Sequence, residues 1–133
     1  MFDLTGKKAL VTGATGGIGK AIATALHAQG ATVCLSGTRA GVLDEGKAGL
    51  GERAHAVVCN LSDPADVEKL VPAAEEAMGG LDILVNNAGI TRDNLAMRMK
   101  PEDWQAVLDV NLTAAFTLIK ASMRGMMKAR WGR

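Results

Sequence analysis

The feature that most constrains the fold is a glycine-rich turn at residues 10–19. It follows a short apolar run and precedes a helical pattern, so it connects a strand to a helix. Gly13 permits a sharp exit from the strand, and Gly19 lets the helix lie close to the sheet. Gly16 and Gly17 present no side chain to an incoming anion. The N–H groups at the start of the helix, with the positive end of its dipole, can therefore hold a pyrophosphate.

The spacing of these glycines is Gly-x-x-x-Gly-x-Gly, whereas the commonest dinucleotide fingerprint is Gly-x-Gly-x-x-Gly. Glycine-rich turns between strands and helices also arise for packing reasons alone. The turn by itself leaves both explanations open.

Apolar periodicity predicts alternating strands and helices along the whole chain. Strands are expected at residues 9–12, 32–36, 54–59 and 82–85, and helices at residues 18–29, 42–50, 64–78 and 101–129. The third helix has the clearest signals, with Asp63 as N-cap and Pro64 in the first turn. Its apolar stripe consists of Val67, Leu70, Val71, Ala74 and Met78. The alternation predicts an α/β fold of the Rossmann type, with a doubly wound parallel sheet in strand order 3-2-1-4.

The longest predicted helix carries a polar side chain in its apolar stripe. That stripe consists of Trp104, Val107, Leu108, Ala115, Leu118, Ile119 and Met126. Asn111 falls within it, and a buried amide costs about 1–3 kcal/mol unless its hydrogen bonds are made. Either Asn111 has a specific partner or neighbouring backbone satisfies it. The other faces are also apolar or small, at Val110, Ala114, Thr117, Ala121 and Met127, which predicts a second buried contact.

The composition is that of a single globular domain spanning residues 1–133. Of the residues, 48% are hydrophobic and 22% charged, and a net charge of +1 gives no reason to expect a nucleic-acid partner. Cys34 and Cys59 lie in separate apolar runs, so we expect buried free thiols in a reducing compartment. His27 and His55 are isolated, and no cluster has metal-ligand spacing. No apolar run approaches the roughly 20 residues of a membrane span and no secretory signal is present, so we expect a cytoplasmic protein without a membrane partner.

Taken together, the motifs resemble the short-chain dehydrogenase/reductase family from end to end. The resemblance rests on Thr12-Gly13-x-x-x-Gly17-x-Gly19, on Asn86-Asn87-Ala88-Gly89 and on Asn111 in the long helix. Residues 89–99 and 123–130 are similar to bacterial 3-oxoacyl-[acyl-carrier-protein] reductases. The resemblance implies NADPH-dependent reduction of the 3-oxo group of an acyl thioester during fatty acid elongation.

The resemblance also implies a role for each matching position. The pyrophosphate and ribose would lie against Gly13, Ala14, Thr15, Gly16, Gly17, Ile18 and Gly19. The adenine would lie beside Asn60 and Leu61, and the cofactor and fourth strand would be supported by Asn87, Ala88 and Gly89. Asn111 would be the structural member of the catalytic tetrad.

The end of the second strand bears on the choice of cofactor. A site that prefers NAD places Asp or Glu there, roughly 20 residues beyond the glycines, to bind the 2′-hydroxyl. This chain has no carboxylate at that place, and Thr38 and Arg39 stand there instead. Arg39 suits the 2′-phosphate of NADP. However, many related reductases carry a basic residue where Gly16 stands, and a solvated Arg39 is the alternative.

The rest of the tetrad has no counterpart in this sequence. In the family a Ser and a Tyr-x-x-x-Lys pair follow the next strand, whereas this sequence contains no tyrosine and ends at residues 131–133, where that strand is expected to begin. We therefore expect the amino-terminal part of a reductase, with the cofactor half and without the acid. The alternative is a dinucleotide-binding module or partner subunit without chemistry.

Two surfaces are candidates for protein partners. The basic residues Arg124, Lys128 and Arg130 can meet an acidic acyl carrier protein, or can merely complement the helix dipole. The apolar strand at residues 82–85 is expected to be an unpaired edge beside an apolar helix. We expect this combination to produce a homo-oligomer.

Overall fold

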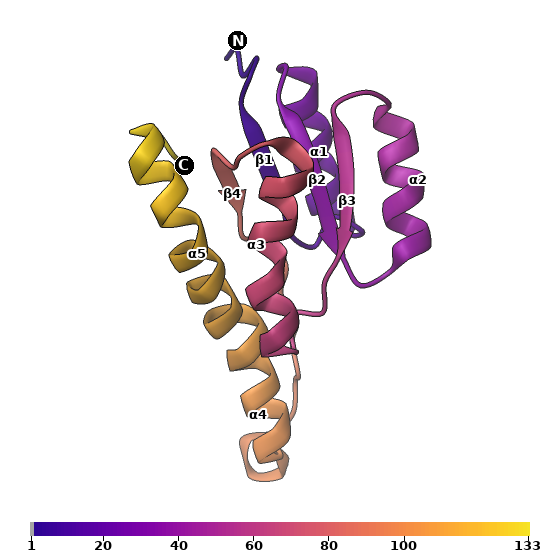
Figure 1. Cartoon of the computed structure of the whole chain (residues 1–133). Coiled ribbons are helices and arrows are strands. Elements are labelled where there is room, and N and C mark those ends of the chain that lie inside the picture. The colour runs from indigo at the N-terminus through magenta and orange to yellow at the C-terminus, as the bar shows by residue number, and fades with distance from the viewer. Residues whose placement is uncertain (1) are drawn as a thin grey trace.

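A four-stranded parallel β-sheet forms the centre of the computed structural model, which describes residues 2–133 (Figure 1). Its strands are β1 (Lys8–Val11), β2 (Thr32–Gly37), β3 (Ala54–Val58) and β4 (Ile83–Val85). They lie in the order β3-β2-β1-β4, and every neighbouring pair is parallel. The predicted α/β class and the predicted strand order are both confirmed.

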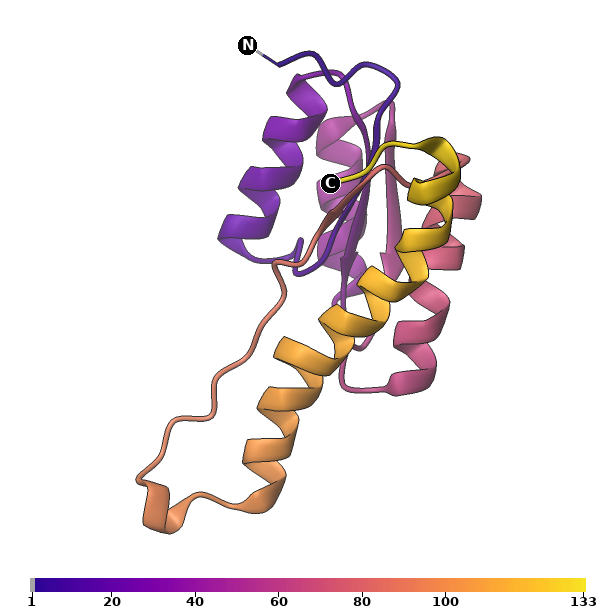
Figure 2. The same cartoon turned by 90° about the vertical axis from the view of Figure 1, so that its left-hand side faces the viewer.

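Helices cover both faces of this sheet. They are α1 (Gly17–Ala28), α2 (Ala40–Leu50), α3 (Pro64–Met78), α4 (Pro101–Leu108) and α5 (Ala114–Ala129). A π-helical turn, η2 (Asp109–Thr113), joins α4 to α5 without a break, and a 3-10 turn, η1 (Ala96–Arg98), lies in the connection before α4. Helices α1 and α2 pack on one face of the sheet, and α3 and α5 pack on the other (Figure 1 and Figure 2).

The side chains of the central strands enter two separate hydrophobic cores, because successive residues in a strand point to opposite faces. Leu10 and its register partner Cys34 pack with α3 and α5. Ala9, Val11 and Val33 pack with α1 and α2. Both faces of β1 and β2 are covered, which explains why these strands form continuous apolar runs in the sequence.

Helix α3 follows its sequence signals closely. The Asp63 carboxylate accepts a hydrogen bond from the Ala65 N–H at 3.1 Å, and Pro64 is the first helical residue. Gly79 ends the helix in the left-handed conformation, with φ of 80°. The predicted stripe from Val67 to Met78 is buried at all five positions.

The predicted apolar stripe of the long helix is wrong in part: Leu118 is buried and Met126 packs against the core, as predicted, but other members of the stripe are exposed. The buried residues are Val110, Ala114, Leu118 and Ser122, whereas Trp104 is 58% exposed and Ile119 is 48% exposed. This helix is apolar around most of its circumference, so periodicity alone could not select the face that packs on the sheet. In addition, the five-residue turn η2 shifts the phase between α4 and α5.

The expectation of a wholly unpaired edge at β4 is wrong in part. The Leu84 N–H donates to the Arg133 carbonyl at 2.9 Å, and the Arg133 N–H donates to the Asp82 carbonyl at 3.0 Å. Trp131, just before this contact, is half-buried against the core formed with α1 and α2, and the Lys7 ammonium lies 3.8 Å from its ring centroid. The last residues therefore cover β4 along part of its length.

Among the described residues, one helix, Pro101–Ala129, is long and apolar enough to cross a membrane, and an 18-residue window within it has a mean hydropathy of 1.3. The apolar runs of the sequence predict no such segment. One helix of this kind is weak evidence, since a core helix of a soluble protein passes the same test. The α5 part of this helix packs on α3 and the sheet through Ala114 and Leu118.

The observed buried face of α5 can be tested with neighbouring residues. Leu118→Ala is expected to lower the free energy of unfolding by about 2–5 kcal/mol, because it leaves a cavity in the core. Ile119→Ala is expected to lower it by less than about 1 kcal/mol, because that side chain is half exposed. Urea denaturation followed by circular dichroism measures both changes. Equal losses would contradict the assignment of the buried face.

Candidate functional site

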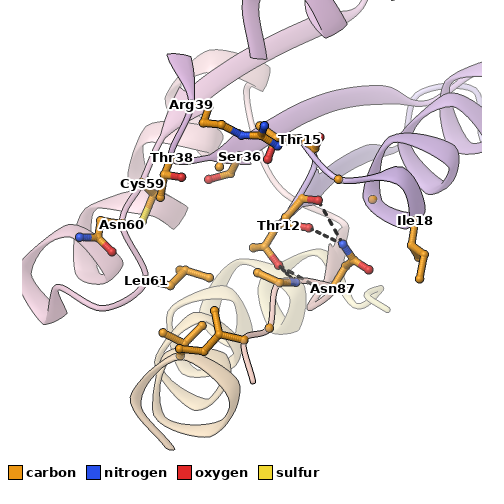
Figure 3. Close-up of a pocket in the computed structure, with 18 of the residues that line it drawn as sticks. Thr12, Thr15, Ile18, Ser36, Thr38, Arg39, Cys59, Asn60, Leu61 and Asn87 are labelled. Atoms are coloured by element: carbon orange, nitrogen blue, oxygen red, sulfur yellow. Dashed lines mark hydrogen bonds between the residues drawn. The ribbon is translucent and has the colours of Figure 1, made fainter. Parts of the chain in front are cut away.

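A cavity of about 450 Å³ lies at the carboxyl ends of all four strands (Figure 3). A volume of this order suits a small-molecule site. The segment after β1 contributes Thr12, Gly13, Thr15, Gly16, Gly17, Ile18 and Gly19, and the end of β2 contributes Ser36, Gly37, Thr38 and Arg39. The segments after β3 and β4 contribute Cys59, Asn60, Leu61, Ser62, Asn87, Ala88, Gly89 and Ile90, and η2 contributes Val110.

The structure brings most of the predicted site residues to this cavity. Two of them do not line it: Ala14 is buried in the core formed with α1 and α2, and Asn111 lies behind Ile90. Several lining residues were not predicted as site residues, namely Thr12, Ser36, Gly37, Cys59, Ser62, Ile90 and Val110. All but Val110 lie within two residues of a predicted site residue at a strand end, so the topology of the sheet was the signal that could have found them.

Thr12 and Asn87 fasten the turn after β1 to the end of β4. The Thr12 hydroxyl donates to the Val85 carbonyl at 3.2 Å and accepts from the N–H groups of Asn87 and Ala88 at 3.1 and 3.0 Å. In return, the Asn87 amide donates to the carbonyls of Thr12 and Gly13 at 3.1 and 3.2 Å. The two strand ends that form the centre of the cavity are thus held by reciprocal side-chain contacts (Figure 3).

The glycines of the first turn serve two different purposes. A Cβ atom on Gly19 would overlap the Gly13 carbonyl oxygen, so Gly19 allows α1 to pack against the turn. Gly13 has φ of +62°, and a Cβ atom there would lie 2.9 Å from the Ala88 Cα. By contrast, a Cβ atom on Gly17 would have no protein atom within 4 Å. Gly17 is therefore not needed for packing and leaves the cavity open.

The start of α1 can bind an anion through its backbone. Its N-cap is Gly16, which has no side chain to cap the helix, and the first intrahelical bond runs from the Lys20 N–H to the Gly16 carbonyl at 3.0 Å. The N–H groups of Gly17, Ile18 and Gly19 come before that bond, so they have no acceptor within the helix. All three residues line the cavity. Helix dipole and free donors together favour a phosphate group here.

Arg39 lies at the other end of the same cavity. It is the N-cap of α2, its side chain is exposed, and its Nη2 donates to the Thr15 carbonyl at 3.2 Å. Among the described residues that line the cavity, none is Asp or Glu. The guanidinium is thus the charged group available to a ligand at this end (Figure 3).

Asn111 is exposed, so its predicted burial is wrong. Its Oδ1 accepts from the Ile90 N–H and its Nδ2 donates to the Ile90 carbonyl, both at 2.8 Å. Of the two explanations that the sequence left open, satisfaction by backbone is the one observed. A Cβ atom on Gly89 would lie 3.2 Å from the Asn111 Oδ1, so the segment after β4 lies directly against this amide.

The two cysteines are buried free thiols, as predicted. Burial raises the pKa of Cys34 to about 12. Burial, followed by the nearby carboxylates of Asp66 and Asp63, raises the pKa of Cys59 to about 11. Cys59 lines the cavity but stays protonated near neutral pH, so it is not an activated nucleophile. Within residues 2–133 no group of three or more His, Cys, Asp or Glu residues is placed to hold a metal ion.

Residues 7–133 match the family model for short chain dehydrogenases, and the chain therefore belongs to this family of oxidoreductases. It is 55% identical over 133 residues to "Nodulation protein G" of Rhizobium sp. (strain N33), covering all of this chain and 54% of that protein. It is 49% identical over 132 residues to the "3-oxoacyl-[acyl-carrier-protein] reductase FabG" of Vibrio cholerae, covering 99% of this chain and 54% of that protein.

A solved structure, from a Sinorhizobium meliloti 1021 protein described as a short-chain alcohol dehydrogenase, superposes with a TM-score of 0.90. The identity is 39%, and the match covers 96% of this chain and 52% of the other. The chain thus spans about half the length of the relatives it matches.

Membership of the family implies a nicotinamide dinucleotide cofactor, and the cavity residues fit one. The N-terminus of α1 provides backbone donors for a pyrophosphate, and Gly16 and Gly17 leave space in front of them. Asn60 and Leu61 offer a polar edge and an apolar surface for a base. The group requires no metal ligand and no reactive thiol, and the site provides neither.

Gly17 and Gly19 form a matched pair for testing this site. Gly17→Ala is expected to leave the free energy of unfolding within about 1 kcal/mol of the wild-type value, since an alanine in a helix costs less than a glycine. It is expected to weaken dinucleotide binding at least tenfold, because the methyl group enters the space before the α1 donors. Gly19→Ala is expected to destabilise the fold itself. Fluorescence titration with NADPH and urea denaturation separate the two effects, and unchanged binding by Gly17→Ala would exclude this anion site.

Proposed function

We propose that this chain is the NADP-binding part of a 3-oxoacyl-[acyl-carrier-protein] reductase. The observation that carries the proposal is the cavity at the strand ends, which combines a free helix N-terminus with Arg39 and has no acidic residue among the described residues that line it. Relatives named as such reductases match 98–99% of the chain at 47–49% identity, which supports the substrate class. A cavity of this kind suits any dinucleotide-dependent enzyme of this family. The proposed cofactor is therefore supported by the site, and the proposed substrate is supported by the relatives.

Each part of the dinucleotide has a partner in this arrangement. The N–H groups of Gly17, Ile18 and Gly19 hold the pyrophosphate, and Asn60 and Leu61 lie at the adenine. Thr38 and Arg39 hold the 2′-phosphate, where the guanidinium makes charge-assisted hydrogen bonds. When bound, NADPH supplies a hydride.

Asn111 is a positioning residue in this proposal. Both polar atoms of its side chain are used by the backbone of Ile90, so it holds the segment after β4 beside the cavity. Ala88, Gly89 and Ile90 line the cavity in that segment, so their backbone fixes one of its walls. A proton donor to the carbonyl oxygen of the substrate is a separate requirement, which Asn111 does not meet.

Arg39 provides the test of cofactor choice. The wild-type chain is expected to bind NADPH at least about tenfold more tightly than NADH, because a hydrogen bond to a charged group contributes about 1.5–3 kcal/mol. Arg39→Asp is expected to reverse the preference, since it removes the phosphate contact and supplies an acceptor for the 2′-hydroxyl. Arg92→Asp makes the same charge change on an exposed residue outside the cavity and serves as the control. Equal affinity of the wild-type chain for the two cofactors would refute the assignment.

The 133-residue chain is expected not to turn over a 3-oxoacyl thioester. In the family a tyrosine protonates the carbonyl oxygen, and this sequence contains none. The assay follows the loss of NADPH absorbance with a 3-oxoacyl substrate, beside the Vibrio cholerae reductase as positive control. Turnover near that of the control would require another proton donor. It would overturn the proposal that this chain holds the cofactor-binding part of the site without the catalytic acid.

The basic end of α5 is the proposed contact for the acyl carrier protein. Arg124 and Lys128 are exposed on its last turns and Arg130 is exposed directly after its end, and a cluster of cations attracts an acidic partner. We also propose that the protein works in the cytoplasm, where a reducing environment keeps Cys34 and Cys59 as thiols.

The exposed apolar face of the long helix is the proposed contact between two copies of the chain. It consists of Leu112, Phe116, Ile119, Met123 and Met127, each 48–70% exposed. Such a continuous stripe favours a partner helix, and a two-fold dimer would bury it on both copies at once.

Met127→Glu tests this contact. It is expected to shift the chain from dimer to monomer, because a carboxylate would be placed within the apolar stripe. Val58→Glu changes an equally apolar, 53% exposed residue on β3 and is expected to leave the mass unchanged. Light scattering over a dilution series measures the mass. A wild-type chain that stays monomeric at high concentration would contradict the proposed dimer.

A further inference from the structure

A second cavity, of about 350 Å³, lies between α1 and α2 on the face of the sheet that these helices cover. We call it the α1–α2 cavity. Among the residues that the structure describes, it shares only Thr15 with the candidate dinucleotide site. The proposed function does not use this cavity, although its size is within the range of small-molecule sites.

A glycine that the packing does not require helps to keep this cavity open. In α2, a Cβ atom on Gly46 would lie 3.1 Å from Leu35 Cδ1, so close packing on the sheet accounts for Gly46. A Cβ atom on Gly49 would have no protein atom within 4 Å. Glycine inside a helix costs about 0.5–1 kcal/mol relative to alanine. Gly49 lines the cavity. The helix stability lost at Gly49 therefore leaves open space in the cavity and does not allow a closer protein contact.

The inner surface of the α1–α2 cavity is apolar. Leu35 from β2 and Ala23 from α1 line it and are 3% and 1% exposed. Val42 and Leu50 line it from α2 and are half-buried. Leu35 and Ala23 are already buried, so an aliphatic ligand would gain mainly by covering the exposed parts of Val42 and Leu50, because removing apolar surface from water is the main favourable term in binding.

One end of the cavity is electrostatically positive. Helices α1 and α2 each follow a strand of the same parallel sheet, so their N-termini and the positive ends of their dipoles lie at the same end. Lys20, in the first turn of α1, lines the cavity there, together with Thr15. Glu45 lines it further along α2, and the lining residues beyond it, Gly46, Gly49 and Leu50, are uncharged. An elongated ligand with an anionic head beside Lys20 and an aliphatic tail toward Leu50 matches this distribution.

We propose that the α1–α2 cavity is a second ligand site, which binds a medium-chain aliphatic carboxylate. The carboxylate pairs with the Lys20 ammonium, and the chain extends over Leu35 and past Gly49. Between Val42 and Leu50 helix α2 rises by about 12 Å, which leaves room for an extended alkyl chain rather than a compact one.

Octanoate is the probe for this site, and proton–nitrogen NMR of the 133-residue chain is the measurement. Octanoate is expected to produce saturable shifts of the amide signals of Ala23, Gly46 and Gly49. Octylammonium, with the same chain and the opposite charge, is expected to bind at least tenfold more weakly. Absence of saturation, or equal affinity for the two probes, would overturn the proposal. NADPH titration of the same sample reports the dinucleotide site separately, so failure at one site is distinguishable from failure at the other.

Two glycines of α2 provide matched variants. Gly49→Leu fills the cavity and is expected to weaken octanoate binding at least tenfold, while helix propensity keeps α2 folded. Gly41→Leu makes the same change on the same helix and serves as the control. A Cβ atom on Gly41 would also have no protein atom within 4 Å, but Gly41 does not line the cavity. The Gly41→Leu chain is therefore expected to bind octanoate like the wild-type chain. Lys20→Gln is expected to weaken octanoate binding, whereas Glu45→Gln is not. A Gly49→Leu chain that is folded by circular dichroism and binds octanoate with wild-type affinity would refute the site.

Discussion

The reciprocal hydrogen bonds between Thr12 and Asn87 are the constraint on which the cavity depends. Strand β4 has three residues and so makes few ladder bonds to β1. Beyond those bonds, the Thr12 hydroxyl and the Asn87 amide hold the departing chains in place. The backbone N–H groups at the start of α1 take no part in this connection, and they precede the first hydrogen bond of the helix, so they stay free to face a ligand. The anion site and the sheet are therefore built from separate sets of hydrogen-bonding groups.

The cavity relies on shape and backbone dipoles more than on charged side chains. Gly13, Gly19 and Gly37 are positions where protein atoms approach too closely for a side chain, and Gly16 and Gly17 are positions where a ligand has space. A binding surface of this kind needs little net charge, which agrees with a chain whose formal charge is +1. Arg39 adds one localised cation at the end of the cavity, where it selects between ligands rather than creating the site.

The sequence predicted those parts of the structure that short-range rules determine. The strand order followed from the alternation of strands and helices, and α3 followed from Asp63, Pro64 and its apolar stripe. Most of the residues predicted to bind the dinucleotide line one cavity at the strand ends. Local pattern could not show which face of the long helix is buried, since the helix is apolar on several faces and changes phase at η2. It also could not show that Asn111 bonds to Ile90 or that Arg133 pairs beside β4, because both contacts join segments far apart in the sequence.

The hydrogen bonds between Asn111 and Ile90 also separate a projecting loop from the part of the chain that forms the cavity. They close residues 91–110 into a loop whose two ends are fixed at one point, and this loop projects away from the sheet in Figure 2. Insertions, deletions or exchanges within the projecting part change the loop without moving its anchor, since extra length in a closed loop costs little free energy. The region is thus free to diversify while the cavity keeps its geometry.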